Sequence, residues 1–171
     1  MDLKIIDGVL DEKFLKNIEH RIIVEKPWFF GYDATNDNDK TRSLSLGHTF
    51  ERCFFTDLEN ILLSKIERLG IDTSKISRCF YNCFRKCDMP KYHIDPVGHT
   101  YMFYLNYEWN RLWGAPTKFK KKKHHISKSV FPKPGRLVIF DSKLLHKGTA
   151  PNMFMPNKHP GRLSIAFHEG R

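Results

Sequence analysis

The 171-residue chain contains no uninterrupted apolar run near the length of about 18 residues that a membrane-spanning helix needs. Its first residues also lack the long apolar core of a secretory signal peptide. These two absences predict a cytoplasmic protein with no membrane partner. No internal repeat and no linker divides the sequence, so we expect one domain over residues 1–171, which is long enough to bury a proper core.

Cysteine is scarce, and the four cysteines suit the reduced thiols of an intracellular protein. Three of them, Cys79, Cys83 and Cys87, are evenly spaced, which raises the possibility of a zinc site. A structural zinc site needs a second closely spaced pair, and only Cys53 is left over. Because residues four apart on a strand share a face, half-buried thiols are the favoured interpretation.

Acidic residues are outnumbered, with 19 aspartates and glutamates against 29 lysines and arginines. The net charge of +10 would attract a polyanion, or an acidic substrate or partner. Much of the excess lies in the run Lys118–His125, which is typical of a solvated loop or hairpin tip. The functional alternative is that Lys120–Lys123 contacts the phosphates of a nucleic acid.

The first 70 residues contain two amphipathic helical patterns. Asp11 is a candidate cap for a helix with Phe14, Leu15, Ile18 and Ile22 on one face. A capping box at Thr56–Glu59 opens a second helix that Gly70 would end. Between them, the polar stretch Gly31–Thr41 is expected to be an exposed loop, and Tyr32–Thr41 is either a variable connection or a lid over the substrate.

After residue 70 the pattern changes to short segments rich in β-branched and aromatic residues, separated by turn formers. We expect strands over 76–84, 100–107, 136–140 and 162–167. Several short strands without intervening helices indicate an antiparallel sandwich or jelly roll. The chain is therefore predicted to be mostly β with flanking α, residues 1–70 supplying helical support and a loop, and residues 71–171 forming the jelly-roll core.

His93 and Asp95 point the same way if their segment is extended, because alternate residues of a strand share a face. His146 follows the expected strand 136–140 and is predicted to lie in a turn. Two histidines and one carboxylate form the ligand set that leaves three positions open on Fe(II) for substrate and oxygen.

Arg162 and Ser164 are expected on one face of the last strand, opposite Leu163, Ile165 and Phe167. Guanidinium and hydroxyl would reach one anion together, and the planar guanidinium suits a carboxylate that it can contact at two points. A buried arginine on the inner face of a small barrel would be costly without such a partner.

The order His93-Ile94-Asp95, then His146, then Arg162-Leu163-Ser164 resembles the HxD…H…RxS pattern of Fe(II)/2-oxoglutarate-dependent oxygenases. The resemblance covers residues 76–167 and is strongest to the prolyl 4-hydroxylase-like branch. It is carried further by Phe80-Tyr81, by the stretch from Tyr104 to Trp109, and by the stretch from Pro134 to Asp141.

The resemblance implies a cupin-like double-stranded β-helix braced by the N-terminal helices. His93, Asp95 and His146 would bind Fe(II), and no catalytic side chain beyond these ligands is implied. Arg162 would pair with the distal carboxylate of 2-oxoglutarate, aided by Ser164 and Tyr104, with Tyr81 as a weaker candidate for that pocket. O2 is the other cosubstrate, and ascorbate is an optional accessory.

The activity implied is hydroxylation of a C–H bond of a peptide, at proline, with release of succinate and CO2. The same chemistry on a nucleotide, a free amino acid or another small molecule stays open, as does a catalytically silent jelly roll that binds nucleic acid through Lys120–Lys123. Position 168 holds a histidine where a nucleic-acid demethylase would usually carry a second arginine, so that subclass is disfavoured. We interpret His168, with the other histidines outside the motif, as a surface or internally satisfied residue. The sequence does not predict the oligomeric state.

Overall fold

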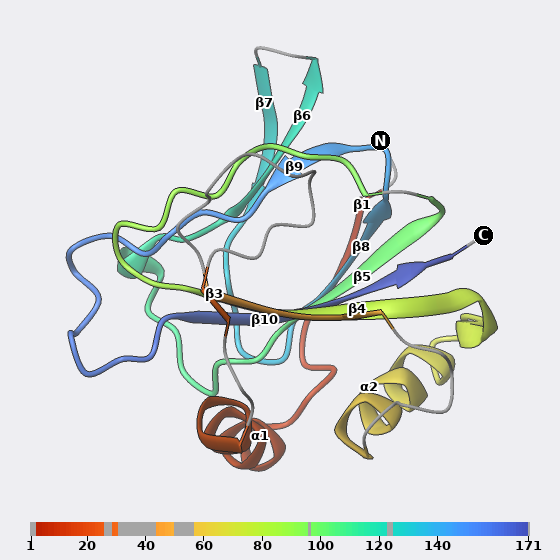
Figure 1. The fold of residues 1–171 in the computed structure, drawn as a ribbon, viewed down its shortest axis with the longest axis horizontal. Coiled ribbons are helices and arrows are strands. Elements are labelled where there is room, and N and C mark those ends of the chain that lie inside the picture. Colours follow the sequence, from red (N-terminus) through yellow and green to blue (C-terminus); the bar gives the residue numbers. More distant parts are fainter. Residues whose placement is uncertain are drawn as a thin grey trace.

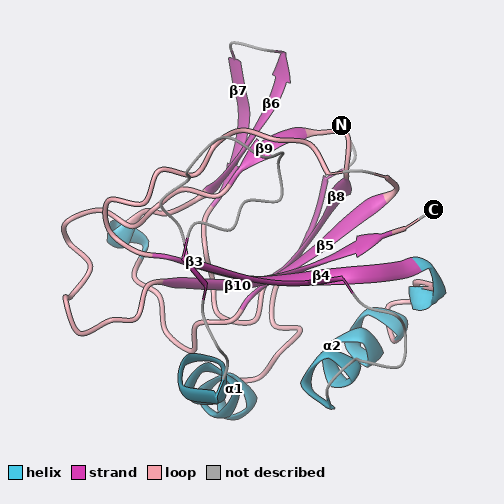
Figure 2. Ribbon diagram, in the orientation of Figure 1, coloured by secondary structure: helices cyan, strands magenta, loops and turns pink. Residues whose placement is uncertain are grey.

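The described part of the chain, in a computed structural model, forms two antiparallel β-sheets with helices on the outer side of the larger sheet (Figures 1 and 2). The structure describes residues 3–25, 29–30, 44–49, 57–95, 97–122 and 125–170. The larger sheet has the strand order β1-β8-β5-β10-β4-β3-β2, and the smaller has the order β7-β6-β9. The helices are α1 (Glu12–Glu25), α2 (Asp57–Glu67), and the short 3₁₀ turns η2 (Thr73–Lys75) and η3 (Arg111–Trp113). The strands are β1 (Leu3–Ile6), β2 (Phe29–Phe30), β3 (Leu44–Thr49), β4 (Ile76–Phe84), β5 (His99–Tyr104), β6 (Thr117–Lys122), β7 (His125–Val130), β8 (Leu137–Asp141), β9 (Leu145–Lys147) and β10 (Arg162–Glu169).

Helix α1 begins as the sequence predicts. The Asp11 carboxylate accepts a hydrogen bond of 2.8 Å from the backbone amide of Phe14, which satisfies one of the free donors of the first turn. Leu15, Ile18 and Ile22 are then buried on one face, because residues three and four apart lie on the same side of a helix. The apolar stripe fixes which face of α1 meets the sheet.

Helix α2 follows the same logic. Leu58, Leu62 and Ile66 are buried at helical spacing. Gly70 ends the helical segment with a φ of +78°, a conformation that glycine adopts without steric cost, and its amide donates to the carbonyl of Glu67. The predicted cap Thr56 lies outside the described residues.

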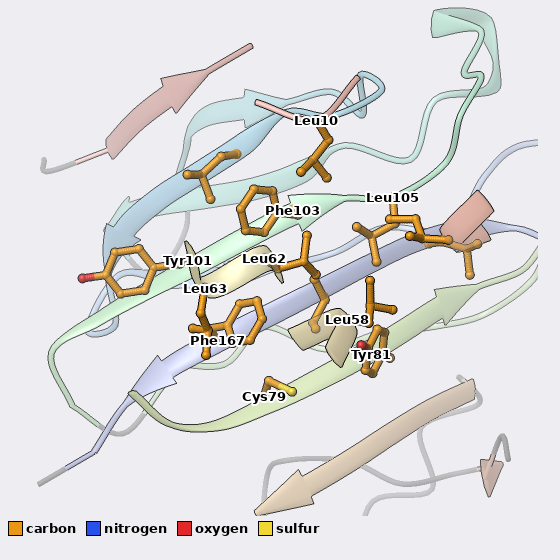
Figure 3. Packing of buried hydrophobic residues seen from close by; sticks show 14 of the residues in the cluster. Leu10, Leu58, Leu62, Leu63, Cys79, Tyr81, Tyr101, Phe103, Leu105 and Phe167 are labelled. Carbon is orange, nitrogen blue, oxygen red and sulfur yellow. The ribbon is translucent and has the colours of Figure 1, made fainter. Parts of the chain in front are cut away.

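The strands β5, β8 and β10 of the larger sheet are buried on both faces. On its outer face, Leu163, Ile165 and Phe167 of β10 pack with α1 and α2 in the main core, part of which is shown in Figure 3. On its inner face, Met102 and Phe140 join residues of the smaller sheet in a second core. Burial of each large side chain of this kind contributes about 1.5–3 kcal/mol. Two buried faces explain why these strands are nearly continuously apolar.

Strand β4 matches its predicted bounds, and β5, β8 and β10 differ from theirs by one to three residues at an end. The first 70 residues contribute more than helices and a loop, because β1 pairs with β8 and β3 pairs with β4. The stretch Gly31–Thr41, with its candidate lid, lies outside the described residues.

Three further expectations can be compared with the structure. The basic run is a hairpin, formed by β6 and β7. Cys79 and Cys83 are buried thiols on β4, Cys87 is exposed, and Cys53 lies outside the described residues. No helix in the described ranges has both the length and the apolarity to cross a membrane.

Candidate functional site

A buried metal-ligand cluster lies between the two sheets. One ligand atom from each of His93, Asp95 and His146 falls within 4.8 Å of the other two, and no other such cluster occurs in the described ranges. His146 lies on the short strand β9, not in the turn that the sequence predicts. Its backbone exchanges two hydrogen bonds of 2.9 Å with His93, so a short antiparallel bridge sets the two imidazoles side by side. The structure therefore brings together all three predicted metal ligands.

The tautomers of the two histidines follow from their backbone contacts. Nδ1 of His93 lies 3.1 Å from the carbonyl of Lys91, and Nδ1 of His146 lies 2.7 Å from the carbonyl of Leu144. A carbonyl oxygen only accepts, so each Nδ1 carries the proton and each Nε2 keeps its lone pair. These Nε2 atoms lie 3.8 Å and 3.5 Å from the Asp95 carboxylate. Both imidazoles thus present a free lone pair to the same space.

The charge states of the cluster suit a cation. Burial, then the neighbouring His93, lower the pKa of His146 to about 4, so this imidazole is neutral at physiological pH. Burial alone would raise the pKa of Asp95. The contact with His168 and the hydrogen bond from Thr100 instead lower it below its ordinary value. The site therefore holds one buried carboxylate charge and the neutral imidazole of His146, next to Nε2 of His93, and a buried carboxylate of this kind favours a cation.

Asp95 is fixed by contacts that the sequence did not reveal. The Thr100 hydroxyl donates to Oδ2 of Asp95 at 2.5 Å, and the Ser142 hydroxyl lies 3.1 Å from that of Thr100. The backbone amide of Asp95 also donates to the carbonyl of Ser142 at 2.8 Å. His168, interpreted from the sequence as a surface or internally satisfied residue, is buried with its Nδ1 3.3 Å from Oδ2 of Asp95. Its neighbour in space is thus the predicted metal ligand itself.

Arg162 is a buried cation on the inner face of β10. Its side chain is 1% exposed, and no carboxylate of the described residues lies within ion-pair distance of its guanidinium. The guanidinium lies 4.9 Å from the centre of the Tyr104 ring and 5.2 Å from that of Phe84. Its Nε atom is buried and has no hydrogen-bond partner among the described residues. Such a group is expensive to bury unless an anion completes it.

The hydroxyl groups around Arg162 form a small network. Nη2 of Arg162 donates to Oγ1 of Thr117 at 2.6 Å, and that oxygen lies 2.8 Å from the hydroxyl of Tyr104. Tyr104 in turn donates to the carbonyl of Val130 at 2.9 Å. Tyr104, which the sequence predicts beside the anion site, lies in this network, and the structure adds Thr117 beside the guanidinium. Thr117 follows the turn residues Gly114–Pro116, and this position in the sequence does not specify the direction of its side chain.

Ser164 lies on the same face of β10 as Arg162, and in register it is opposite Tyr104 of β5. Tyr81 does not join this pocket, contrary to the expectation from the sequence. It is buried in the core between the sheet and the helices (Figure 3). Its hydroxyl donates to Glu59 of α2 at 2.5 Å. Alternate residues of β4 face opposite ways, and Tyr81 shares the outer face with Cys79 and Cys83.

Two backbone features shape the space around Arg162. A side chain at Gly148 would place its Cβ 2.6 Å from Nη1 of Arg162 and against the Phe84 ring, so only glycine fits there. Asn106 accepts from the Leu163 amide at 2.8 Å and donates to the Gly161 carbonyl at 3.0 Å. These two hydrogen bonds hold the backbone on both sides of Arg162 and so fix the position from which its side chain extends.

The outer face of the smaller sheet is basic. Lys118 of β6 and Lys147 of β9 are cross-strand partners, and the ammonium groups of Lys120 and Lys147 lie 3.9 Å and 4.8 Å from the centre of the Tyr92 ring. Burial, then the charges of Lys118 and Lys120, lower the pKa of Lys147. Like charges that face each other across a ladder repel, so this face favours an anionic partner. The side chains of residues 121–123, the rest of the candidate nucleic-acid contact, lie outside the described part.

Comparisons with known proteins agree on the architecture. No family model matches the sequence, and no curated protein matches it at a significant level. A Pseudomonas putida prolyl-4-hydroxylase matches in structure with a TM-score of 0.69 and 14% identity, over 99% of this chain and 92% of that one. A Trichoplax adhaerens prolyl hydroxylase, in complex with a peptide fragment of the hypoxia inducible factor oxygen degradation domain, matches with a TM-score of 0.67 and 16% identity, over 96% and 81%. A 2OG-Fe(II) oxygenase family oxidoreductase from Burkholderia pseudomallei matches with a TM-score of 0.65 and 14% identity, over 98% and 86%.

These similarities confirm the predicted fold, a double-stranded β-helix braced by helices on one sheet. The suspected resemblance is thus confirmed in architecture, since the solved structures that this chain matches include prolyl hydroxylases and 2OG-Fe(II) oxygenases. Identities of 14–16% carry no residue-level role across, so the chemistry of this site depends on its own geometry.

Proposed function

We propose that this protein is an Fe(II)- and 2-oxoglutarate-dependent dioxygenase that hydroxylates a C–H bond of a peptide, at proline. The observation that carries the proposal is a pair of complementary buried groups between the sheets. One is the two-histidine, one-carboxylate cluster, and the other is Arg162, a buried cation without a carboxylate partner in the described part. The first suits a metal with open positions, and the second suits the far carboxylate of a chelating cosubstrate.

The residues present fit Fe(II). His93, Asp95 and His146 would hold it through two neutral nitrogens and one anionic oxygen, the ligand types of non-haem iron sites in oxygenases. Both Nδ1 protons are already engaged by backbone carbonyls, which fixes the rings before the metal binds. The chain therefore needs little rearrangement of these side chains to accept the ion.

The residues present also fit 2-oxoglutarate. Arg162, with the hydroxyls of Thr117 and Tyr104 beside it, would hold the distal carboxylate, and Ser164 lies on the same face. Iron and 2-oxoglutarate, when bound, would supply the oxidant that converts a C–H bond to C–OH with loss of CO2 and formation of succinate. Phe119 and Phe140, which pack against His146, would keep water away from that reaction.

A peptide substrate is supported by one of the structural matches, whose description names a bound peptide fragment. The basic outer face of the smaller sheet adds a preference for acidic sequences near the target residue. Tyr92 and Lys147 of that face directly adjoin the ligands His93 and His146 in the chain, so an acidic flank would bind next to the metal centre.

The test is succinate formation from 2-oxoglutarate with Fe(II), O2 and ascorbate, using a proline-containing peptide library with and without acidic flanks. We expect peptide-dependent turnover that His93→Ala and Arg162→Ala both abolish, with hydroxyproline detected by mass spectrometry. Turnover with nucleotides or free amino acids in place of peptides would overturn the substrate class. Absence of metal binding would overturn the enzymatic function, and salt-sensitive nucleic-acid binding that needs neither residue would favour the silent binding protein.

A further inference from the structure

His168 lies next to the metal cluster without belonging to it. It shares the inner face of β10 with Arg162, and its side chain is 5% exposed. Its Nδ1 atom lies 3.3 Å from Oδ2 of Asp95 and 3.3 Å from the hydroxyl oxygen of Thr100. The cluster of candidate ligand atoms within 4.8 Å of one another contains His93, Asp95 and His146 only. His168 therefore meets the candidate site through a ligand, not through the metal position.

The two oxygens of Asp95 have different surroundings. Oδ2 receives the Thr100 hydroxyl at 2.5 Å and lies next to Nδ1 of His168. Oδ1 accepts no hydrogen bond from the described residues; Nε2 of His93 lies 3.8 Å from it, and Nε2 of His146 lies 3.5 Å from Oδ2. Because two donors contact Oδ2, the lone pairs of Oδ1 are the more accessible ones. The carboxylate is thereby turned to offer Oδ1 to an ion.

The backbone around His168 is held on both sides. In register, His168 is opposite Thr100 of β5 and Arg78 of β4, so it lies in the interior of the sheet. The next residue, Glu169, accepts from the Tyr101 hydroxyl at 2.6 Å and from the His99 amide at 2.8 Å. The imidazole also packs edge-on against the Phe80 ring, with 5.5 Å between centroids. These contacts leave the ring one well-defined place, beside Asp95.

We propose that His168 is a positioning residue for the metal centre, whose Nδ1–H, with the Thr100 hydroxyl, holds Oδ2 of Asp95 so that Oδ1 binds the metal. This inference rests on the proposed function, because it assumes that Asp95 is a ligand. Groups that orient a ligand from behind typically change metal affinity about 10- to 100-fold when they are removed. If His168 only filled space, a substitution of similar volume would leave the metal affinity unchanged.

The test compares two nearly isosteric substitutions. In His168→Asn the side-chain amide nitrogen takes the place of Nδ1 and still donates, whereas in His168→Leu a methyl group takes that place. Co(II) is the probe, titrated without O2 and followed by its visible absorption, so the readout does not depend on turnover. We expect His168→Leu to weaken Co(II) binding about 10- to 100-fold and His168→Asn to stay within about threefold of wild type.

Two further variants make the result decisive. His168→Phe keeps an aromatic ring against Phe80 without the nitrogen, and it replaces His168→Leu if that variant does not fold. Phe167→Leu alters the neighbouring buried residue on the opposite face, and we expect it to lower thermal stability without changing Co(II) affinity. Equal affinity in wild type and His168→Leu, equal weakening by Asn and Leu, or comparable weakening by Phe167→Leu would each overturn the inference and leave the proposed function intact. A wild type that binds no Co(II) would overturn the proposed function.

Discussion

His93 and His146 exchange both of their backbone hydrogen bonds, each 2.9 Å long, although they come from segments far apart in the sequence. The bridge ties the loop before β5 to strand β9, and the Asp95 amide extends it by donating to Ser142. The positions of three candidate ligands are thus set by main-chain pairing, which forms with the fold. A metal site built this way is preorganised and should exist before any ion arrives.

The first prediction concerns removal of the metal. Chelation should leave the protein folded, because neither apolar core includes any of the three candidate ligands. Addition of Mn(II) at about 100 times its dissociation constant should raise the free energy of unfolding by about 2.7 kcal/mol. Chemical denaturation followed by circular dichroism measures this difference. His93→Ala should abolish the increment, and a chelated protein without a cooperative transition would contradict the prediction.

The second prediction concerns Thr117, which contacts Arg162 and Tyr104. Thr117→Val removes the hydroxyl and leaves Nη2 of Arg162 without its acceptor, at a cost of about 1–1.5 kcal/mol in cosubstrate binding. The KM for 2-oxoglutarate should rise about tenfold, with a smaller change in kcat. Thr117→Ser restores the oxygen and should recover most of the loss. An unchanged KM for 2-oxoglutarate in Thr117→Val would show that this residue does not contribute to binding of the anion.

The third prediction concerns Gly148, the glycine that lies against Arg162. Gly148→Ala places a methyl group against Nη1 of Arg162 and the Phe84 ring, both of which are buried. Because these neighbours have little room to move, the guanidinium must shift, and the KM for 2-oxoglutarate should rise at least tenfold. Gly70→Ala is the control, since a Cβ there meets no atom within 4 Å and lies far from the pocket along the chain. It should lower stability alone, because the backbone of Gly70 has a positive φ.

The fourth prediction compares the same change on opposite faces of the larger sheet. Tyr81→Phe removes a buried partner of the Glu59 carboxylate and should lower the free energy of unfolding by about 1–3 kcal/mol. It should leave the KM for 2-oxoglutarate unchanged. Tyr104→Phe, on the inner face, should raise that KM. Steady-state kinetics and thermal melts of both variants separate the structural role of Tyr81 from the cosubstrate-binding role of Tyr104. A large increase in the KM for 2-oxoglutarate in Tyr81→Phe would indicate that Tyr81 contributes to the pocket.

The fifth prediction concerns the basic face. Lys118→Glu should lower kcat/KM severalfold for peptides with acidic flanks at low salt, because charge complementarity mainly raises the association rate. The difference from wild type should shrink at about 1 M salt, where charges are screened within about 3 Å. Lys13→Glu is the control, because it makes the same charge change on α1, on the side of the larger sheet that faces away from the smaller sheet. Equal effects of the two substitutions would indicate a net-charge effect and not a binding surface.

The sequence predicts the ligands better than it predicts what surrounds them. His93 and Asp95 are two residues apart in an extended segment, so alternation alone aligns them. Thr117 and His168 lie at the site because strands distant in the sequence pair with each other. The register of that pairing cannot be predicted from the local hydrophobic pattern. Tyr81 was misplaced for a related reason. Both faces of β4 carry buried aromatic residues, Phe80 and Phe84 on one and Tyr81 on the other, so the pattern does not show which face meets the helices.

The hydrophobic spacing of β4 and β10 and the capped helices made the fold predictable, because both signals are local. The strands β1 and β9 escaped prediction since they are short and are stabilised by partners elsewhere in the sheets. His146 was placed in a turn for this reason, although its strand character is what pairs it with His93.

Strand β10 carries Arg162 at its first residue and His168 near its end, both on the inner face, and it lies between β5 and β4. A central strand is inextensible, with a rise of about 3.3 Å per residue. On the proposed function, β10 therefore connects the anion site at Arg162 with the positioning residue His168 through one stretch of paired backbone and not through a movable loop. The anion site could move relative to Asp95, the ligand that His168 contacts, only if a strand paired on both sides were displaced.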